Sequence, residues 1–212
     1  MSIRTTIAER ALWSSLFLLG GWLMAGSARA EDVVIKHAGQ HHEYSVELEP
    51  HGDAGFFVPD AGSGVGIGGR FTFPIVRNGF VKSINNSVGI GVGVDWVHYN
   101  GCFFIRDAAG ECAALNRVWI PVVMQWNFYL SSHWSIFAEP GLAVAYSDWG
   151  SNCVVDNSGP GPGRFVCGPA PNRVDFEPVV IFVGGRYHFS DQASLTMRIG
   201  WPYASIGVSF FP

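Results

Sequence analysis

The chain has 212 residues and a formal net charge of −4 at pH 7, and 48% of its residues are hydrophobic whereas only 14% are charged. This length suits one domain, and an acidic balance without a basic cluster excludes nucleic acid as an expected partner. The 27 glycines and the 14% of aromatic residues suit a β-protein whose surface is not wetted all round.

Residues 1–30 have the parts of a secretory signal peptide. Arg4 and Arg10 give a positive start, an uncharged run follows as far as Ala25, and small residues at positions 28 and 30 form a cleavage site. The apolar run is shorter than the ~20 residues that a membrane-spanning helix needs. The predicted organisation is a cleaved signal peptide (1–30), a polar periplasmic N-terminal tail (31–42) and a β-barrel domain (43–212).

Apolar residues at every second position dominate the rest of the chain, and this is the period of a β-strand. Between Val88 and Trp96, for example, apolar residues alternate with Gly and Asp. Out-of-phase charges at Asp175 and Glu177 indicate a β-bulge in the sixth strand. The eight predicted strands are 43–50, 64–75, 86–98, 117–130, 134–147, 174–189, 194–201 and 203–211.

The links between these strands alternate in length. Residues 131–133 and 190–192 form short links, whereas the first, third and fifth links are long and rich in Gly, Pro and Asn. Short turns at one end and long loops at the other are typical of a bacterial outer-membrane barrel. The termini are then expected on the short-turn, periplasmic side.

The alternation fits two barrels of opposite polarity: a soluble one with an apolar interior and a membrane one with an apolar exterior. The polar face has few charges, and their signs are mixed, so they could pair in a narrow lumen. We therefore predict an all-β, eight-stranded antiparallel up-and-down transmembrane β-barrel. The charges expected in its lumen are Glu47, Glu49, Arg70, Asp95, Glu139, Arg186 and Arg198. The aromatic residues expected to form interfacial girdles near strand ends are Trp96, Trp126, Phe128, Trp134, Tyr146 and Trp201.

The whole of the chain after residue 30 resembles, in pattern, the small outer-membrane β-barrel proteins of the OmpA-like and OmpX-like group. Members of that group end on a strand with a polar residue, a Gly two positions later and a terminal aromatic residue. Here Ser205, Gly207 and Phe210 fit this pattern, whereas Phe211 lies one position early because the chain ends on Pro212. The resemblance implies an assembly signal read by the barrel-assembly machinery, and a location in outer-membrane lipid.

The four cysteines are Cys102, Cys112, Cys153 and Cys167. Behind an export signal an even number is interpreted as disulfides, and four cysteines allow three connectivities. We favour Cys102 with Cys112 and Cys153 with Cys167, because each pair then closes its own external loop. A zinc site is disfavoured, since neither pair has CxxC spacing.

Possible catalytic groups lie in unsuitable places. His133, Ser135 and Glu139 are the residue types of a catalytic triad, but His133 falls in a predicted periplasmic turn, far from the outer leaflet. His98 and Asp95, near the outer rim, have no nucleophile beside them. We therefore expect no enzymatic activity.

Metal and phosphate sites are also weakly indicated. His37, His41 and His42, beside Glu43, could bind zinc or copper, but we interpret them as part of a flexible polar tail. The Gly-rich residues 62–69 lack the Lys-Ser/Thr and the helix of a phosphate loop. The sequence predicts no cofactor.

The interior of an eight-stranded barrel is just wide enough for side chains, so the lumen charges are interpreted as structural ion pairs, with a gated or proton-conducting path as the alternative. We expect a monomer with a structural or surface-interaction role carried by disulfide-constrained loops such as 148–173, whose external partner the sequence does not identify. The alternatives are an outer-membrane lipid-modifying enzyme and a soluble periplasmic ligand-binding barrel.

Overall fold

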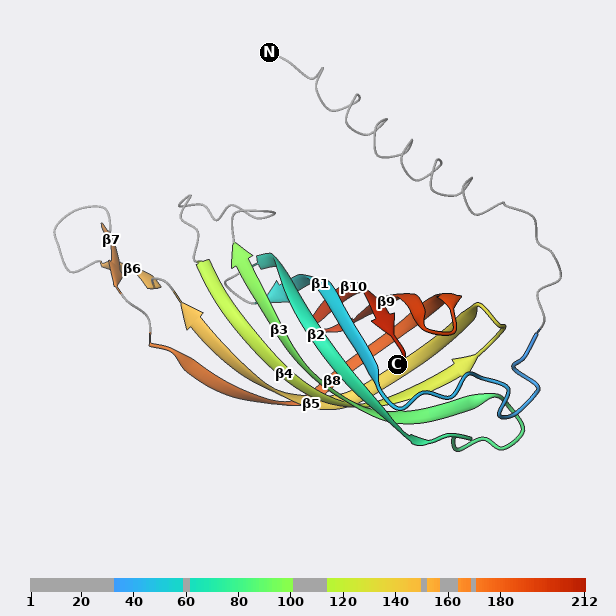
Figure 1. Cartoon of the computed structure of the whole chain (residues 1–212). Coiled ribbons are helices and arrows are strands. Elements are labelled where there is room, and N and C mark those ends of the chain that lie inside the picture. Colours follow the sequence, from blue (N-terminus) through green and yellow to red (C-terminus); the bar gives the residue numbers. More distant parts are fainter. Residues whose placement is uncertain (1–32, 59–61, 101–113, 150–151, 157–163, 169–170) are drawn as a thin grey trace, which may run out of the picture. The chain divides into compact units, whose positions relative to one another are not determined.

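The computed structural model describes residues 33–58, 62–100, 114–149, 152–156, 164–168 and 171–212. Eight antiparallel strands close into a barrel in the order β1-β10-β9-β8-β5-β4-β3-β2 (Figure 1). This confirms the predicted fold class. The barrel strands are β1 (Glu47–Val58), β2 (Gly62–Val76), β3 (Asn86–Asn100), β4 (Ala114–Tyr129), β5 (Trp134–Trp149), β8 (Arg173–Ser190), β9 (Ala193–Trp201) and β10 (Tyr203–Phe210).

A small hairpin lies in the link between β5 and β8. Its strands, β6 (Asn152–Asp156) and β7 (Arg164–Gly168), form a separate two-stranded sheet. This link and the link over residues 101–113 join their strands at one end of the barrel, and the shorter links at 130–133 and 191–192 lie at the other. We call these the loop end and the turn end. Because the number of barrel strands is even, the first and last strands both have their outer termini at the turn end.

The first strand differs from the prediction. The sequence predicts a strand over 43–50 and a long link after it, whereas β1 spans Glu47–Val58 and only residues 59–61 separate it from β2. The outward residues of the missed half include Gly52 and Ala54, whose small side chains give no apolar alternation to detect. Pairing with β2 and β10 nevertheless continues through this half of the strand.

The predicted bulge in β8 is confirmed. Gly141 of β5 pairs with Val180, but Ala143, two residues further on, pairs with Glu177, three residues back on β8. The extra residue lies beside Pro178, which lacks the N–H that a regular ladder would use at that position.

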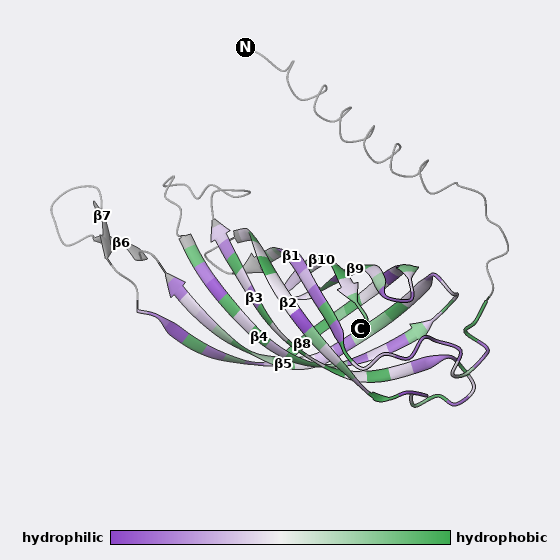
Figure 2. Ribbon diagram, viewed as in Figure 1, coloured by the Kyte–Doolittle hydropathy of each residue, from purple (hydrophilic) through white to green (hydrophobic). Residues whose placement is uncertain are grey.

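Hydrophilic and hydrophobic residues alternate along the barrel strands (Figure 2), and a period of two places successive side chains on opposite faces of the sheet. On β2 the exposed fractions of Val65 and Ile67 are 70% and 67%, whereas Arg70 and Thr72 are buried. Glu47 and Glu49 of β1 are likewise buried. The barrel therefore has charged groups inside and large apolar side chains outside. In the part of the chain that the structure describes, no helix is long and apolar enough to cross a membrane.

Residues 33–46 pack against the turn end, which differs from the flexible tail that the sequence predicts. Val33 forms a β-bridge with Ser131, and the amide of Asn85 donates to the carbonyl of Ile35. The His41 ring stacks on Tyr129 with a centroid distance of 4.3 Å. These backbone hydrogen bonds and this ring contact fix the segment against the turns of the barrel.

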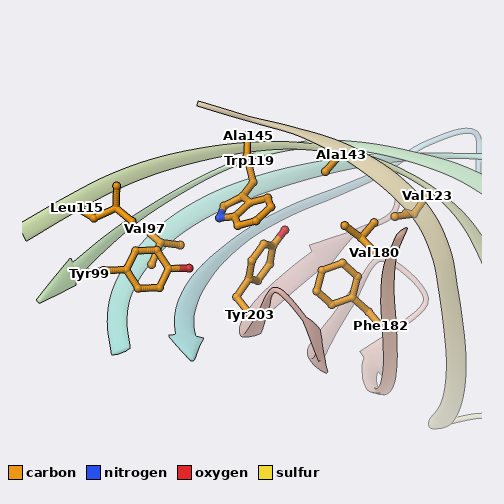
Figure 3. Close-up of a cluster of buried hydrophobic side chains, with 10 residues drawn as sticks. All are labelled: Val97, Tyr99, Leu115, Trp119, Val123, Ala143, Ala145, Val180, Phe182 and Tyr203. Carbon is orange, nitrogen blue, oxygen red and sulfur yellow. The ribbon is translucent and has the colours of Figure 1, made fainter. Parts of the chain in front are cut away.

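An apolar cluster fills the lumen toward the loop end (Figure 3). Tyr99, Leu115 and Trp119 come from the loop-end parts of β3 and β4, and Tyr203 begins β10. The remaining members are Val97, Val123, Ala143, Ala145, Val180 and Phe182. The Arg117 guanidinium lies 4.1 Å from the Trp119 ring centroid beside this cluster and pairs with Glu177 at 2.9 Å.

Candidate functional site in the barrel lumen

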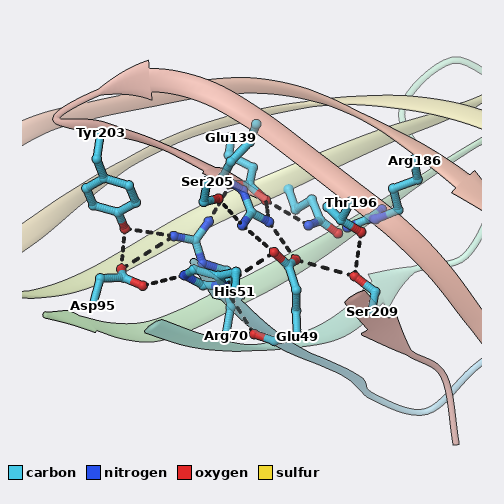
Figure 4. A network of polar contacts seen from close by, with 12 residues as sticks. Glu49, His51, Arg70, Asp95, Glu139, Arg186, Thr196, Tyr203, Ser205 and Ser209 are labelled. Carbon is cyan, nitrogen blue, oxygen red and sulfur yellow. Dashed lines mark hydrogen bonds and ion pairs between the residues drawn. The ribbon is translucent and has the colours of Figure 1, made fainter. Parts of the chain in front are cut away.

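Polar side chains from all eight barrel strands meet in the half of the lumen between the apolar cluster and the turn end (Figure 4). They form three layers along the barrel axis. Each layer centres on one ionisable group from β1, because Glu47, Glu49 and His51 are spaced two residues apart and point to the same face.

The first layer, nearest the turn end, joins β1 to β8. Arg186 donates through Nη2 to both carboxylate oxygens of Glu47, at 2.7 and 2.9 Å, and through Nη1 to Asn127 Oδ1 at 2.7 Å. Ser209 donates to Glu47 Oε1 at 2.7 Å. The Arg186 guanidinium also lies 4.5 Å from the centroid of the Phe137 ring. Both charges are therefore paired although both are buried, and Arg186 Nε is left without a hydrogen-bond partner among the described residues.

The second layer connects five strands, β1, β2, β4, β5 and β9. Arg198 of β9 forms a two-pronged pair with Glu49, with N–O distances of 2.6 and 2.8 Å. Its Nε lies 3.2 Å from Glu139 Oε2, and Arg70 donates to the same oxygen at 2.5 Å. Gln125 donates to Glu139 Oε1 at 2.8 Å. Glu139 is thus shared between two arginines, which crosslinks β2, β5 and β9.

The third layer contains an imidazole and two carboxylates. His51 Nε2 lies 2.7 Å from Asp95 Oδ1 and 3.5 Å from Asp53 Oδ1. Tyr203 donates to Asp95 Oδ2 and accepts from Arg70 Nη2 at 3.2 Å. The side chains of His51, Asp53 and Asp95 are wholly inaccessible to solvent.

All seven charges that the sequence places in the lumen are buried, and the structure brings six of them into the first two layers, with Asp95 in the third. His51 and Asp53 were missed, because the predicted first strand stopped at residue 50. The signal was present: Glu47, Glu49, His51 and Asp53 are polar at every second position, which continues the strand pattern.

The catalytic residue types noted in the sequence are arranged differently from a triad. Ser135 Oγ lies 3.0 Å from Nε2 of His188, whereas His133 lies in the turn before β5. The exposed fraction of Ser135 is 0%, and Glu139 is engaged by the arginines. A substrate has no access to this hydroxyl, so Ser135 acts here as a partner for the His188 ring.

His41 and His42 border a cavity of about 150 Å³ at the turn end. His41 Nδ1 is 2.7 Å from Asn85 Oδ1, which uses one ring nitrogen in docking. Tyr44 contacts the Phe211 ring at a centroid distance of 4.9 Å, and burial raises the pKa of its hydroxyl well above the usual value. The cavity therefore lies between the docked segment and the barrel end.

The other predicted residues lie as follows. Ser205 points into the lumen near Arg198, Phe210 is exposed, and Phe211 is buried at the turn end. Cys102 and Cys112 lie outside the described residues. Cys153 of β6 is the register partner of Cys167 of β7. Of the aromatic residues expected at the interfaces, four are exposed: Trp96, Trp134, Tyr146 and Trp201.

No protein-family model matches the chain, and no curated protein is similar to it in sequence. Among solved structures it is similar to Ail, the attachment invasion locus protein of Yersinia pestis, with 7% identity, a TM-score of 0.43, and coverage of 81% of this chain and 99% of Ail. It is also similar to Neisserial surface protein A, with 12% identity, a TM-score of 0.45, and coverage of 79% and 96%.

Proposed function

We propose that this protein is a non-enzymatic outer-membrane β-barrel with a structural or surface-interaction role. The observation that carries the proposal is the polarity of the barrel. Charged side chains such as Arg186 and Glu139 are buried inside, whereas large apolar side chains face outward on β2, β3, β4, β5, β8, β9 and β10. In water this arrangement would expose far more apolar surface than soluble proteins tolerate. In a bilayer it places the apolar side chains in hydrocarbon, and closure pairs the backbone groups.

The lumen supports a scaffold in preference to a wide diffusion pore. Eight strands enclose a space that side chains can fill, and here the three charged layers and the apolar cluster occupy it. Rigid scaffolds commonly carry recognition on their loops. The longest links, 101–113 and the one containing β6 and β7, are both at the loop end, which is the external end in this proposal.

A disulfide between Cys153 and Cys167 would constrain the second of these loops. Directly opposed residues of an antiparallel pair have Cα atoms about 4.5–5.5 Å apart, within the range that a disulfide requires. The register of β6 and β7 supports this pairing. The proposed pairing of Cys102 with Cys112 rests on their spacing in the sequence.

Export and assembly belong to the same proposal. Residues 1–30 would direct the chain to the periplasm, and the Ser205, Gly207 and Phe210 pattern of β10 would engage the barrel-assembly machinery. The protein would then lie in outer-membrane lipid as a monomer.

Extraction from cells tests the location. After cell disruption we expect the protein in the outer-membrane fraction, resistant to alkaline carbonate and released by detergent. Unboiled samples should migrate differently from boiled ones on SDS gels, because a closed barrel resists unfolding by SDS. A folded monomer in detergent-free buffer would contradict the proposal. An altered acyl pattern of lipid A in a deletion strain, measured by mass spectrometry, would contradict the non-enzymatic role alone.

A further inference from the structure

We propose that His51, Asp53 and Asp95, the third layer of the lumen, form a binding site for one Zn²⁺ ion. Their candidate ligand atoms all lie within 4.8 Å of one another. Zinc binds imidazole nitrogen and carboxylate oxygen at about 2.0–2.2 Å, so three atoms at this spacing can surround one ion after small side-chain movements. The inference concerns a site inside the barrel and does not depend on the role of the external loops.

The first argument is the carboxylate of Asp53. Neither of its oxygens has a hydrogen-bond partner among the described residues, and both are buried. A buried, unpartnered carboxylate is costly, and it needs a cation or a hydrogen-bond donor. Its Oδ1 faces His51 Nε2 at 3.5 Å, too far for a good hydrogen bond but suited to a shared ion.

The second argument is the orientation of the His51 ring. Nδ1 lies 3.2 Å from the backbone carbonyl of Glu49. Without an ion, Nε2 donates to Asp95 Oδ1 at 2.7 Å; with Nδ1–H donating to the carbonyl, an ion could replace the proton on Nε2 and face both carboxylates. Metal-binding histidines are commonly oriented in this way, with the second ring nitrogen bonded to a carbonyl. A proton on Nε2 would satisfy Asp95 alone, whereas a metal ion would satisfy Asp95 and Asp53 together.

The third argument is the balance of buried charge. Among the described residues, the buried ionisable side chains comprise five carboxylates and three arginines, together with His51. With a neutral imidazole and all five carboxylates ionised, this buried set would carry two negative charges in excess, which is the charge that one divalent cation supplies. The five carboxylates are Glu47, Glu49, Asp53, Asp95 and Glu139.

The surroundings leave room for the site and shield it. A Cβ added at Gly68 would collide with Asp95 Oδ1 and His51 Nε2, so the absent side chain provides the space that these groups occupy. Tyr203 donates to the second oxygen of Asp95 and can orient it as an outer-shell partner. Toward the loop end Tyr99 and Trp119 cover the layer. An ion would therefore enter during folding more readily than afterwards.

Zinc is preferred over calcium or magnesium because of the donor set. One imidazole and two carboxylates suit zinc, whereas Ca²⁺ and Mg²⁺ favour sites made of oxygen ligands only. Three protein ligands leave one position of a tetrahedral ion for water.

The test is to fold the purified full chain in detergent with ZnCl₂, remove loosely bound metal by gel filtration, and measure zinc by atomic absorption. We expect about one Zn²⁺ per barrel. The variants Asp53→Asn and His51→Gln should bind zinc more weakly by at least the ~10–100-fold that loss of an outer-shell partner costs. The matched control His98→Gln, which changes an imidazole near Asn116, should bind zinc as the original protein does.

A variant with His37, His41 and His42 replaced by Gln removes the N-terminal histidines as a source of bound zinc, and it should also retain one ion. If a lumen variant fails to fold, the zinc K-edge absorption spectrum of the original protein still identifies the types of ligand around the ion. One nitrogen ligand with oxygen ligands supports the site, and two or more imidazoles contradict it. Absence of zinc after folding, or zinc unaffected by Asp53→Asn in a folded barrel, would overturn the proposal.

Discussion

Arg198 connects two buried carboxylates, and its guanidinium illustrates how the lumen charges depend on one another. It pairs with Glu49 through two nitrogens and reaches Glu139 with Nε. Pairs of this kind contribute little net stability relative to apolar packing, but removal of one member leaves the others charged and buried. Arg198 is therefore energetically important because its loss would leave the Glu49 and Glu139 carboxylates buried without this partner.

We predict that Arg198→Met lowers the free energy of unfolding by about 3–5 kcal/mol, the range found when one partner of a buried ion pair is removed. The measurement is urea unfolding of the protein folded in lipid vesicles, followed by tryptophan fluorescence. The control is Arg77→Met, which breaks the Arg77–Glu43 pair, whose side chains are 73% and 59% exposed. That change should cost less than about 1 kcal/mol. Equal losses in the two variants would contradict a buried network.

His41 is the second residue for which one substitution has a defined local effect. His41→Ala removes the stacking on Tyr129 and the hydrogen bond to Asn85. We expect the loss of each interaction to reduce the stability of the docked segment by about 1 kcal/mol at most. Amide hydrogen exchange should become faster over residues 33–46 and stay unchanged in the barrel strands, since local opening does not require the barrel to open. His42→Ala, an exposed neighbour, is the control. Unchanged exchange in both variants would show that the segment is held in another way.

At the scale of the elements, the proposed disulfide between Cys153 and Cys167 should protect the hairpin of β6 and β7 from proteolysis. Peptide mapping without reductant should recover Cys153 and Cys167 in one linked pair. The double variant Cys153→Ser/Cys167→Ser should raise the rate of proteolytic cleavage in this loop, because a crosslink closing about 15 residues restricts the open chain by about 3 kcal/mol. Gel mobility of the unboiled barrel should not change. Recovery of a peptide linking Cys153 to Cys102 or Cys112 would refute the pairing.

The elements also show what alternation in a sequence can reveal. The segments around Val88–Trp96 and Val118–Phe128 are predicted correctly, because their outward residues are large and apolar in unbroken alternation. The second half of β1 is missed, because its outward Gly52 and Ala54 are small and Pro50 resembles a turn signal. The hairpin of β6 and β7 is too short to stand out from its loop.

The partners within the lumen could not be derived from the sequence. The inward direction of Glu47 or Arg198 follows from alternation, but the choice of partner follows from the stagger of the closed sheet. Glu47 meets Arg186 across 139 residues, and Glu49 meets Arg198 across 149. The same stagger leaves the Asp53 carboxylate without a hydrogen-bond partner among the described residues, which the sequence alone does not predict. The sequence thus predicts which charges are buried better than it predicts which charges meet.

For the molecule as a whole, the proposed membrane location predicts that the outer surface responds to charge according to depth in the bilayer. Ile67 lies on the apolar face of β2, whereas Phe80 lies in the link between β2 and β3 at the turn end, and both are more than half exposed. We predict that Ile67→Arg costs about 2–4 kcal/mol and Phe80→Arg about 0–1 kcal/mol, since arginine is most costly near the bilayer midplane. Unfolding in vesicles measures both. Similar costs at the two positions would contradict membrane insertion.

The distribution of lumen charges along the chain has a consequence for assembly. Among the described residues, the five buried carboxylates lie on β1, β3 and β5, whereas Arg186 and Arg198 lie on β8 and β9. A sheet made only of the first five barrel strands would therefore hold an acidic face with Arg70 as its sole buried arginine among the described residues. Such a face is stable only while it is hydrated. The seam between β1 and β10 joins the two ends of the barrel domain, and its closure brings both missing arginines to their carboxylates at the moment when water is displaced. Charge neutralisation and dehydration are thus coupled to a single event, which favours an intermediate that remains open to water until the last strands arrive.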